Sequence, residues 1–247
     1  MNISKAANIT SNGVPLDRLY GNDALVWQRD TVGQNIIAEG SIGASGAPWT
    51  LYDNGQVVVM PGIINWNHGS ASPWDVHRDL VKTIVFHGAG YVIGPRTRSL
   101  FNSLPSLHTI VGLDGLDMSN VTYMNSMFRN TSSLVDIGDI SGWDTSDVTS
   151  MAAMFFGASS LTELNLSDWD TSNVETMSSM LGNTTGLDVL DISNWTFPPQ
   201  TANLSNMFSE SGLNTAYVGS EEARQWLLDA PRWGRIPPRA IVVQDPT

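Results

Sequence analysis

The chain of 247 residues carries few side chains at the spacing that catalysis or metal binding requires. Zinc sites take three or four ligands, and the chain has no cysteine and no HExxH motif. His68 and His77 share one loop, but two histidines are too few for a structural site, and His87 and His108 stand apart. Neither a GxSxG motif nor a glycine-rich phosphate loop is present. The sequence therefore predicts a protein that is not an enzyme and holds neither a metal nor a cofactor.

Carboxylates are abundant, and their placement is uneven. The formal net charge is −12, and the stretch from Leu107 to Leu213 contains 13 acidic residues against Arg129 alone. The remainder is neutral. An acidic surface of this kind repels phosphate backbones, so nucleic acid is not an expected partner. Several of these acids recur at fixed intervals before turns, which is typical of aspartates that cap turns; they are Asp144, Asp147, Asp170 and Asp191.

The same stretch is an internal repeat. Its closing leucines fall at positions 107, 134, 161, 187 and 213, and tryptophans recur at 143, 169 and 195. A fixed period in the twenties is the signature of a solenoid, in which each unit shares its core with its neighbours. The leucine positions define four copies between residues 107 and 213.

One copy suggests two elements. The segment "LTELNLSDW" (161–169) alternates leucines as a short strand does, and "DTSNVETMSSML" (170–181) places Val174, Met177 and Met180 at helical spacing. Ser172 and Glu175 have the spacing of a capping box that would begin this helix. The predicted fold is therefore an α/β solenoid, a leucine-rich-repeat-like stack of strand–turn–short-helix units with the methionines in its core.

The run W-D-T-S-x-V-x-x-M-x-x-M within these copies resembles the BspA-like leucine-rich repeats of bacterial surface proteins. The resemblance covers about 105 residues, and it departs in the fourth copy, where "TFPPQTANL" replaces "DTSNVETM". It implies a repeat domain that makes contacts with proteins or glycans at a surface.

Stacking would place equivalent residues in columns, which are the candidate binding sites. A polar column suits neutral or cationic ligands or a protein surface, although a solvated face without a ligand is the alternative. A tryptophan column could stack on sugar rings, although a buried ladder is the alternative. The candidates are Asp139, Asn165 and Asp191; Ser141, Ser167 and Ser193; and Trp143, Trp169 and Trp195.

The flanking regions are expected to seal the stack. Residues 36–106 predict a β-rich N-terminal capping domain, with a hairpin in "PWTLYDNGQVVVMPG" and a buried strand in "VKTIVF", and this region resembles the one that precedes BspA-like repeats. Residues 214–247 predict a C-terminal cap, with a helix that begins after Ser220 and a last strand at 239–244. The four repeats occupy residues 107–213.

Residues 1–35 predict a small β meander, and "VPLDRLYGNDALVWQRD" within it resembles a segment of bacteriophage tail and virion proteins. The resemblance implies a virion-attachment segment, whereas an ordinary hairpin is the alternative. The apolar anchors would be Leu19, Tyr20, Val26 and Trp27.

The start of the chain has no apolar stretch typical of a secretion signal, and no run approaches 18 apolar residues, so membrane insertion is not expected. A virion protein, released by lysis, needs no such signal. The first expectation is a bacteriophage structural protein of the tail tip, baseplate or another exposed site. It would contact other virion proteins and a host cell-surface protein or glycan, and a homo-oligomer would fit virion symmetry. The alternatives are a fragment of a bacterial cell-surface adhesin and a capsid-surface decoration protein.

Overall fold

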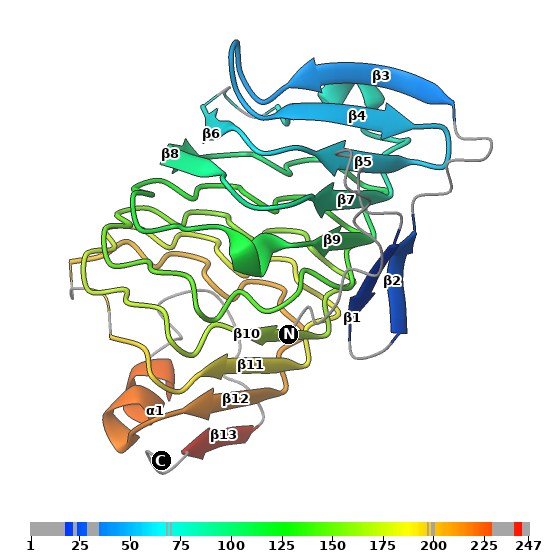
Figure 1. The fold of residues 1–247 in the computed structure, drawn as a ribbon. Coiled ribbons are helices and arrows are strands. Elements are labelled where there is room, and N and C mark those ends of the chain that lie inside the picture. The colour runs from blue at the N-terminus through cyan, green and yellow to red at the C-terminus, as the bar shows by residue number, and fades with distance from the viewer. Residues whose placement is uncertain are drawn as a thin grey trace.

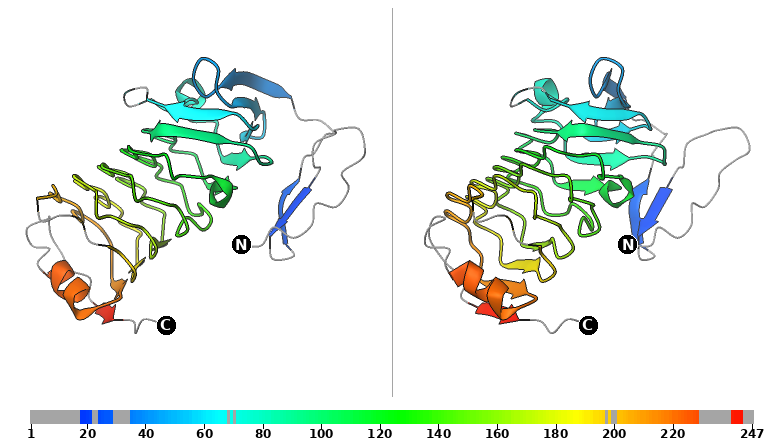
Figure 2. Two further views of the ribbon diagram at one scale, coloured as in Figure 1. Left: turned by 60° about the vertical axis from the view of Figure 1, so that its left-hand side comes forward. Right: turned by 90° about the vertical axis from the view of Figure 1, so that its left-hand side faces the viewer.

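The protein winds into a solenoid of mostly β structure, seen along its length in Figure 1 and from two other sides in Figure 2. The structure is a computed structural model. It describes residues 18–21, 24–28, 35–67, 69, 71–196, 198, 201–228 and 240–243.

The first sheet has five strands in the order β3-β4-β5-β7-β9. Strands β3, β4 and β5 pair antiparallel, and β5, β7 and β9 pair parallel. The hairpin expected at Asp53-Asn54-Gly55 is confirmed, and Gly55 adopts a φ of 87° there. The bounds are Ile36–Ser41 for β3, Pro48–Tyr52 for β4, Gln56–Val59 for β5, Thr83–Phe86 for β7 and Thr109–Val111 for β9.

The second sheet has four parallel strands, β10 (Glu163–Asn165), β11 (Val189–Ile192), β12 (Thr215–Val218) and β13 (Ala240–Val243). Helix α1 (Glu221–Leu228) follows β12. The backbone N–H of Ala223 donates to the Ser220 hydroxyl at 3.1 Å, so the helix begins as the sequence predicts. The predicted last strand is also present.

Two smaller strand pairs complete the described fold. Strand β6 (Ile63–Trp66) pairs parallel with β8 (Val92–Thr97), and β1 (Arg18–Gly21) forms an antiparallel pair with β2 (Ala24–Gln28). The pair β1–β2 is the hairpin expected between residues 18 and 28. The first strand of the expected meander, and the side chains of the proposed anchors Leu19, Tyr20, Val26 and Trp27, lie outside the described part of the chain.

The parallel winding begins earlier than the sequence repeat indicates. Val57, Ile84 and Ile110 pair in register across β5, β7 and β9, and all three are buried, so the coils start near residue 56 rather than at Leu107. One continuous apolar core extends from Ile42 to Leu227. The β-rich region before residue 106 therefore shares its core with the repeats.

The prediction of a short helix in each copy is wrong. Among the described residues the only α-helix is α1, and residues 170–183 form consecutive turns. Ser172 donates its backbone N–H to the Asp170 carboxylate at 2.9 Å instead of capping a helix. The apolar residues still point inward, since Val174, Met177 and Met180 are fully buried as expected.

These turns form what we call the turn ladder, residues 97–103, 124–130, 151–157, 177–183 and 204–210. Every second backbone N–H group in the turn ladder donates to a carbonyl of the next coil. In an α-helix it would donate to the carbonyl four residues earlier in the same segment. Met177 donates to Asn203 at 2.9 Å, and Asn183 donates to Ser209 at 2.7 Å. Left-handed backbone at Ser179 (φ 56°) and Asn183 (φ 58°) excludes an α-helix and recurs at equivalent positions in the other coils.

Candidate functional site

The three predicted tryptophans stack inside the coils. Trp143, Trp169 and Trp195 are at most 5% exposed, and the first two rings stack at a centroid distance of 6.1 Å. Each indole N–H donates to a backbone carbonyl of the preceding coil: Trp143 to Leu113 at 3.0 Å, Trp169 to Ile140 at 2.9 Å and Trp195 to Leu166 at 2.6 Å. The column is a structural ladder that offers almost no ring surface to a ligand.

The second predicted column, Asp139, Asn165 and Asp191, lies where each coil leaves the sheet. In all three residues Oδ1 accepts the backbone N–H of the serine two positions later, at 2.9 to 3.0 Å. These bonds fix the side chains, of which Asp139 and Asn165 are exposed and Asp191 is half-buried. The hydroxyl and backbone N–H of Ser141 hold the pKa of Asp139 below its ordinary value.

The third predicted column, Ser141, Ser167 and Ser193, is the donor set for these turns. Ser141 is buried, and the other two serines are half-buried. Their backbone N–H groups position the column of Asp139, Asn165 and Asp191. The turn-capping role predicted for aspartates is confirmed for Asp144, Asp170 and Asp191.

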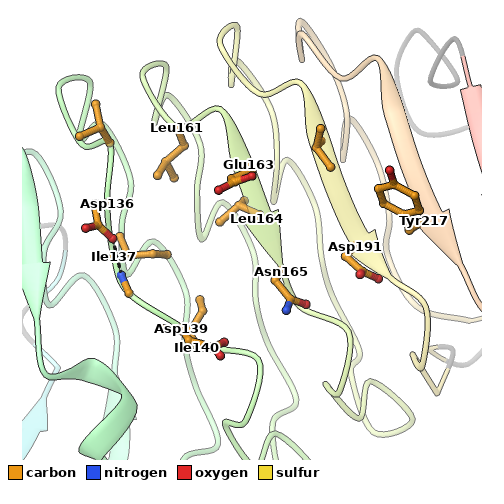
Figure 3. Close-up of a pocket in the computed structure, with 13 residues that line it drawn as sticks. Asp136, Ile137, Asp139, Ile140, Leu161, Glu163, Leu164, Asn165, Asp191 and Tyr217 are labelled. Carbon is orange, nitrogen blue, oxygen red and sulfur yellow. Dashed lines mark hydrogen bonds between the residues drawn. The ribbon is translucent and has the colours of Figure 1, made fainter. Parts of the chain in front are cut away.

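The Asp139 column borders a hollow of about 450 Å³, which we call the sheet groove. Its size falls within the roughly 300–1,000 Å³ of ligand sites. Figure 3 shows Asp136 and Asp139 on one coil, Glu163 and Asn165 on β10, and Asp191 and Tyr217 on the two following strands. The lining residues are Val135, Asp136, Ile137, Gly138, Asp139, Ile140, Leu161, Glu163, Leu164, Asn165, Val189, Asp191 and Tyr217.

The groove lies at a break in the sheet. Strand β9 ends the first sheet and β10 begins the second, while the coil of residues 135–140 lies between them without forming a strand. Between residues 135–140 and β10, all of which the structure describes, no backbone hydrogen bond forms. Strand β10 therefore has an open edge that faces the groove.

A one-residue bulge explains the break. Nine positions separate Leu134 from Trp143, but eight separate Leu161 from Trp169 in the next coil. Gly138 takes up the extra residue in left-handed backbone (φ 69°), and its N–H donates to Asp136 Oδ1 at 2.8 Å instead of to a neighbouring strand. An extra residue of this type disrupts the local ladder and bends the chain.

The rim of the groove is acidic and its floor is apolar. Asp136, Asp139, Glu163 and Asp191 supply four carboxylates, and no Lys, Arg or His is among the lining residues. Within the described residues none of these four carboxylates forms an ion pair. The floor consists of buried aliphatic side chains that belong to the core, namely Ile137, Ile140, Leu161 and Leu164.

Asp136, Glu163 and Tyr217 were not among the sequence candidates. Glu163 lies two residues before Asn165 and therefore on the same face of a strand. Tyr217 lies 26 residues after Asp191 and pairs with it in register, so extending the column by one period would have found it. The bulge has one sequence signal, the nine positions from Leu134 to Trp143, but this spacing does not show that Asp136 lies at a groove.

Other candidate chemistry is sparse in the described residues. No three His, Asp or Glu side chains lie close enough together to hold a metal ion there, and His68 lies outside them. Within the described part of the chain, no helix has the length and apolar character needed to cross a bilayer.

Residues 97–218 match the family described as "Mycoplasma protein of unknown function, DUF285". The match covers just under half of the chain and runs from the last residue of β8 to the last residue of β12, so it includes the whole sheet groove. No curated protein matches the chain significantly. The solenoid of this chain is therefore similar to a bacterial protein family whose description assigns no activity.

Proposed function

We propose that the protein is a non-enzymatic structural component of a bacteriophage virion, at the tail tip, the baseplate or another exposed site. Its repeat domain, of the BspA-like leucine-rich-repeat type, contacts a protein or glycan on the host surface. The observation that carries the proposal is the sheet groove, which four carboxylates line above buried aliphatic side chains, three of the four being held by backbone N–H groups.

The chemistry of the groove favours contact over catalysis. A general acid or base works best with a pKa near the operating pH, so a carboxyl that acts in this way near neutral pH has a raised pKa. The pKa of Asp139 is lowered by the two groups of Ser141, so this carboxyl stays ionised. A permanently charged, hydrogen-bonded carboxylate is suited to binding.

We assign the two ends of the stack as caps. At the carboxyl end, Ala223 and Leu227 of α1 are buried in the core and β13 pairs with β12. At the amino end, the antiparallel strands β3 and β4 cover the first parallel strand. Sealed ends suit a solenoid that stays folded as one part of a larger particle.

Attachment to the particle is assigned to residues 1–35, through the apolar side chains of Leu19, Tyr20, Val26 and Trp27. The hairpin β1–β2, in which Leu19 pairs with Trp27, supports a compact segment at this position. Other virion proteins would be its partners.

A bacterial cell-surface adhesin is the second candidate. The similarity of residues 97–218 to a Mycoplasma family favours it, because that family is bacterial. A capsid-surface decoration protein remains a variant of the virion proposal.

The test is binding of the fluorescently labelled full chain to bacterial cells, combined with immunogold labelling of phage particles from the producing strain. We expect saturable binding to host cells and gold at an exposed position on the particle. Gold on particles without binding to cells would indicate a purely architectural role. Binding to cells without gold on any particle would favour the adhesin.

A further inference from the structure

We propose that the sheet groove binds an extended peptide segment rich in lysine or arginine, which adds as a strand to the open edge of β10. The inference rests on the proposed contact function and names the class of ligand for it. The partner is therefore a protein that presents a basic, unpaired segment.

The first argument is the direction of the backbone groups of β10. Leu166 donates its N–H to Asp191 at 2.9 Å, and the carbonyl of Thr162 accepts the N–H of Val189 at 3.1 Å, so these groups face β11. Backbone groups alternate in direction along a strand, and those of Glu163 and Asn165 therefore face the groove. In the described chain they have no backbone partner. An extended peptide supplies the matching donors and acceptors.

The second argument is the position of the charges. The carboxylates lie on both sides of the open edge, with Asp136 and Asp139 on the preceding coil and Glu163 and Asp191 on the following strands. Alternate side chains of an added strand point to one face, so basic residues at every second position would reach this set. No cation of the lining residues competes for these carboxylates.

The third argument is preorganisation. Three of the four carboxylates are held by backbone N–H groups: Asp136 by Gly138 at 2.8 Å, Asp139 by Ser141 at 3.0 Å and Asp191 by Ser193 at 2.9 Å. Side chains that are fixed before binding lose little conformational entropy on binding.

A glycan fits these features less well. Sugar rings stack on exposed aromatic faces, but the three repeat tryptophans are buried, and only Tyr217 contributes a ring to the groove. A sugar also has no regular series of backbone donors and acceptors for an open strand edge.

The test uses the full chain and the hexapeptide acetyl-Lys-Val-Lys-Val-Lys-Val-amide in a calorimetric titration. We expect D139N/E163Q to weaken binding about tenfold, which corresponds to roughly 1.4 kcal/mol. The control D144N/E175Q removes the same two charges outside the groove and should change the affinity less than twofold. Asn165 forms the same turn as Asp139, so D139N keeps the local fold.

A second peptide, N-methylated at alternate residues, tests strand addition. Methylation removes the N–H donors along one edge of the peptide, so we expect at least tenfold weaker binding than that of the unmethylated peptide when this edge is the one that faces β10. A third peptide carries the methyl groups on the other alternate set, and at least one of the two must lose affinity. Equal affinity of all three peptides would overturn strand addition.

Other outcomes separate this inference from the proposed function. Equal weakening by the two double variants, or no binding of the hexapeptide, would overturn the basic-peptide site. Equally tight binding of the unaltered chain and both double variants to host cells would show that contact occurs elsewhere on the protein, which overturns the inference and leaves the proposed function standing. Glycan-array binding that D139N/E163Q abolishes, without peptide binding, would assign the groove to a sugar and overturn the peptide proposal.

Discussion

Short polar side chains hold the turns of every coil by one local device. Asp139 and Asp144 each accept the backbone N–H and the hydroxyl of the serine two positions later. These donors stabilise the ionised carboxylate, so the pKa of both aspartates is lowered in the folded protein. The part of the stabilisation that accompanies the lowered pKa is present only while the carboxylates are charged.

We expect Ser141→Ala to raise the pKa of Asp139 toward its ordinary value and to leave that of Asp144 unchanged, because only the Asp139 hydroxyl donor is lost. Ser146→Ala should do the converse and is the matched control. Carboxyl NMR titration measures both values. Because the folded-state pKa is lowered, the contribution to stability is present above the unfolded value of about 3.9 and is lost as the pH falls through the folded value.

The indole N–H of Trp169 is a second residue-scale device. In Trp169→Phe the carbonyl of Ile140 loses one of its two donors and keeps the backbone N–H of Trp143 at 3.2 Å, so we expect the free energy of unfolding to fall by about 0.5–1.5 kcal/mol in urea denaturation. Tyr123→Phe changes an exposed ring and should have little effect. An unchanged stability of Trp169→Phe would mean that the indole bond does not select tryptophan at this position.

At the scale of the elements, the turn ladder decides the fold. Its left-handed positions recur as Ser126, Ala153, Ser179 and Asn206, with φ between 53° and 57°. Serine and asparagine tolerate this backbone better than alanine, because their side chains can bond locally. Ala153 is therefore the strained member of the column.

We expect Ala153→Gly to raise the free energy of unfolding by about 0.5–1 kcal/mol, because glycine removes the left-handed penalty. Ala152→Gly, at ordinary backbone one residue earlier, should lower it by about 0.5–1 kcal/mol. Chemical denaturation of both variants gives the comparison. Loss of stability in both would show that Ala153 is not strained.

The sequence predicted the strands better than the turns, for a physical reason. Alternation at Leu164 and Leu166 and the hairpin at Asp53-Asn54-Gly55 have a single structural meaning. The spacing of Val174, Met177 and Met180 is compatible with two structures, because a pair of turns buries the same residues as a helix does. Isolated helices shorter than about 12–15 residues are marginal in water, so bonds to the neighbouring coils select the turns.

The candidate site was predictable only in part. Asp139, Asn165 and Asp191 follow from the period, and the structure gathers them at one groove. The groove itself depends on the Gly138 bulge and on missing bonds between coils, which are properties of the fold rather than of any short motif. The tryptophans were equally periodic but are buried, because periodicity does not distinguish the inside of a coil from its outside.

At the scale of the whole molecule, the core runs unbroken through all coils. Each coil contacts only its neighbours, so a complete coil is removable in principle. We expect a variant lacking residues 161–186 to fold, because Leu187 then takes the place of Leu161 and the register continues. Circular dichroism should show β structure and a cooperative thermal transition.

The control for that deletion removes half a coil, residues 174–186. It removes the turn-ladder side of one coil and joins two strand sides directly, which exposes core residues and should give an aggregated protein on size-exclusion chromatography. A folded half-coil variant would contradict the continuous register of the stack.

The open edge of β10 also has a mechanical consequence. Most neighbouring coils are joined by backbone bonds on two sides, but between the coil of residues 135–140 and the coil of β10 the backbone bonds lie only at and beside the turn ladder. Side-chain bonds add to them: the Trp169 indole to Ile140, Thr145 to the carbonyl of Asp170 at 2.9 Å and Ser160 to the carbonyl of Ser132 at 2.6 Å. When the solenoid is stretched or bent along its long axis, we expect these two coils to separate first on the sheet side. The turn ladder would then act as the hinge. A peptide strand bound in the sheet groove would join the two coils and restrict this bending. Ligand binding in the groove and the stiffness of the whole solenoid are therefore coupled.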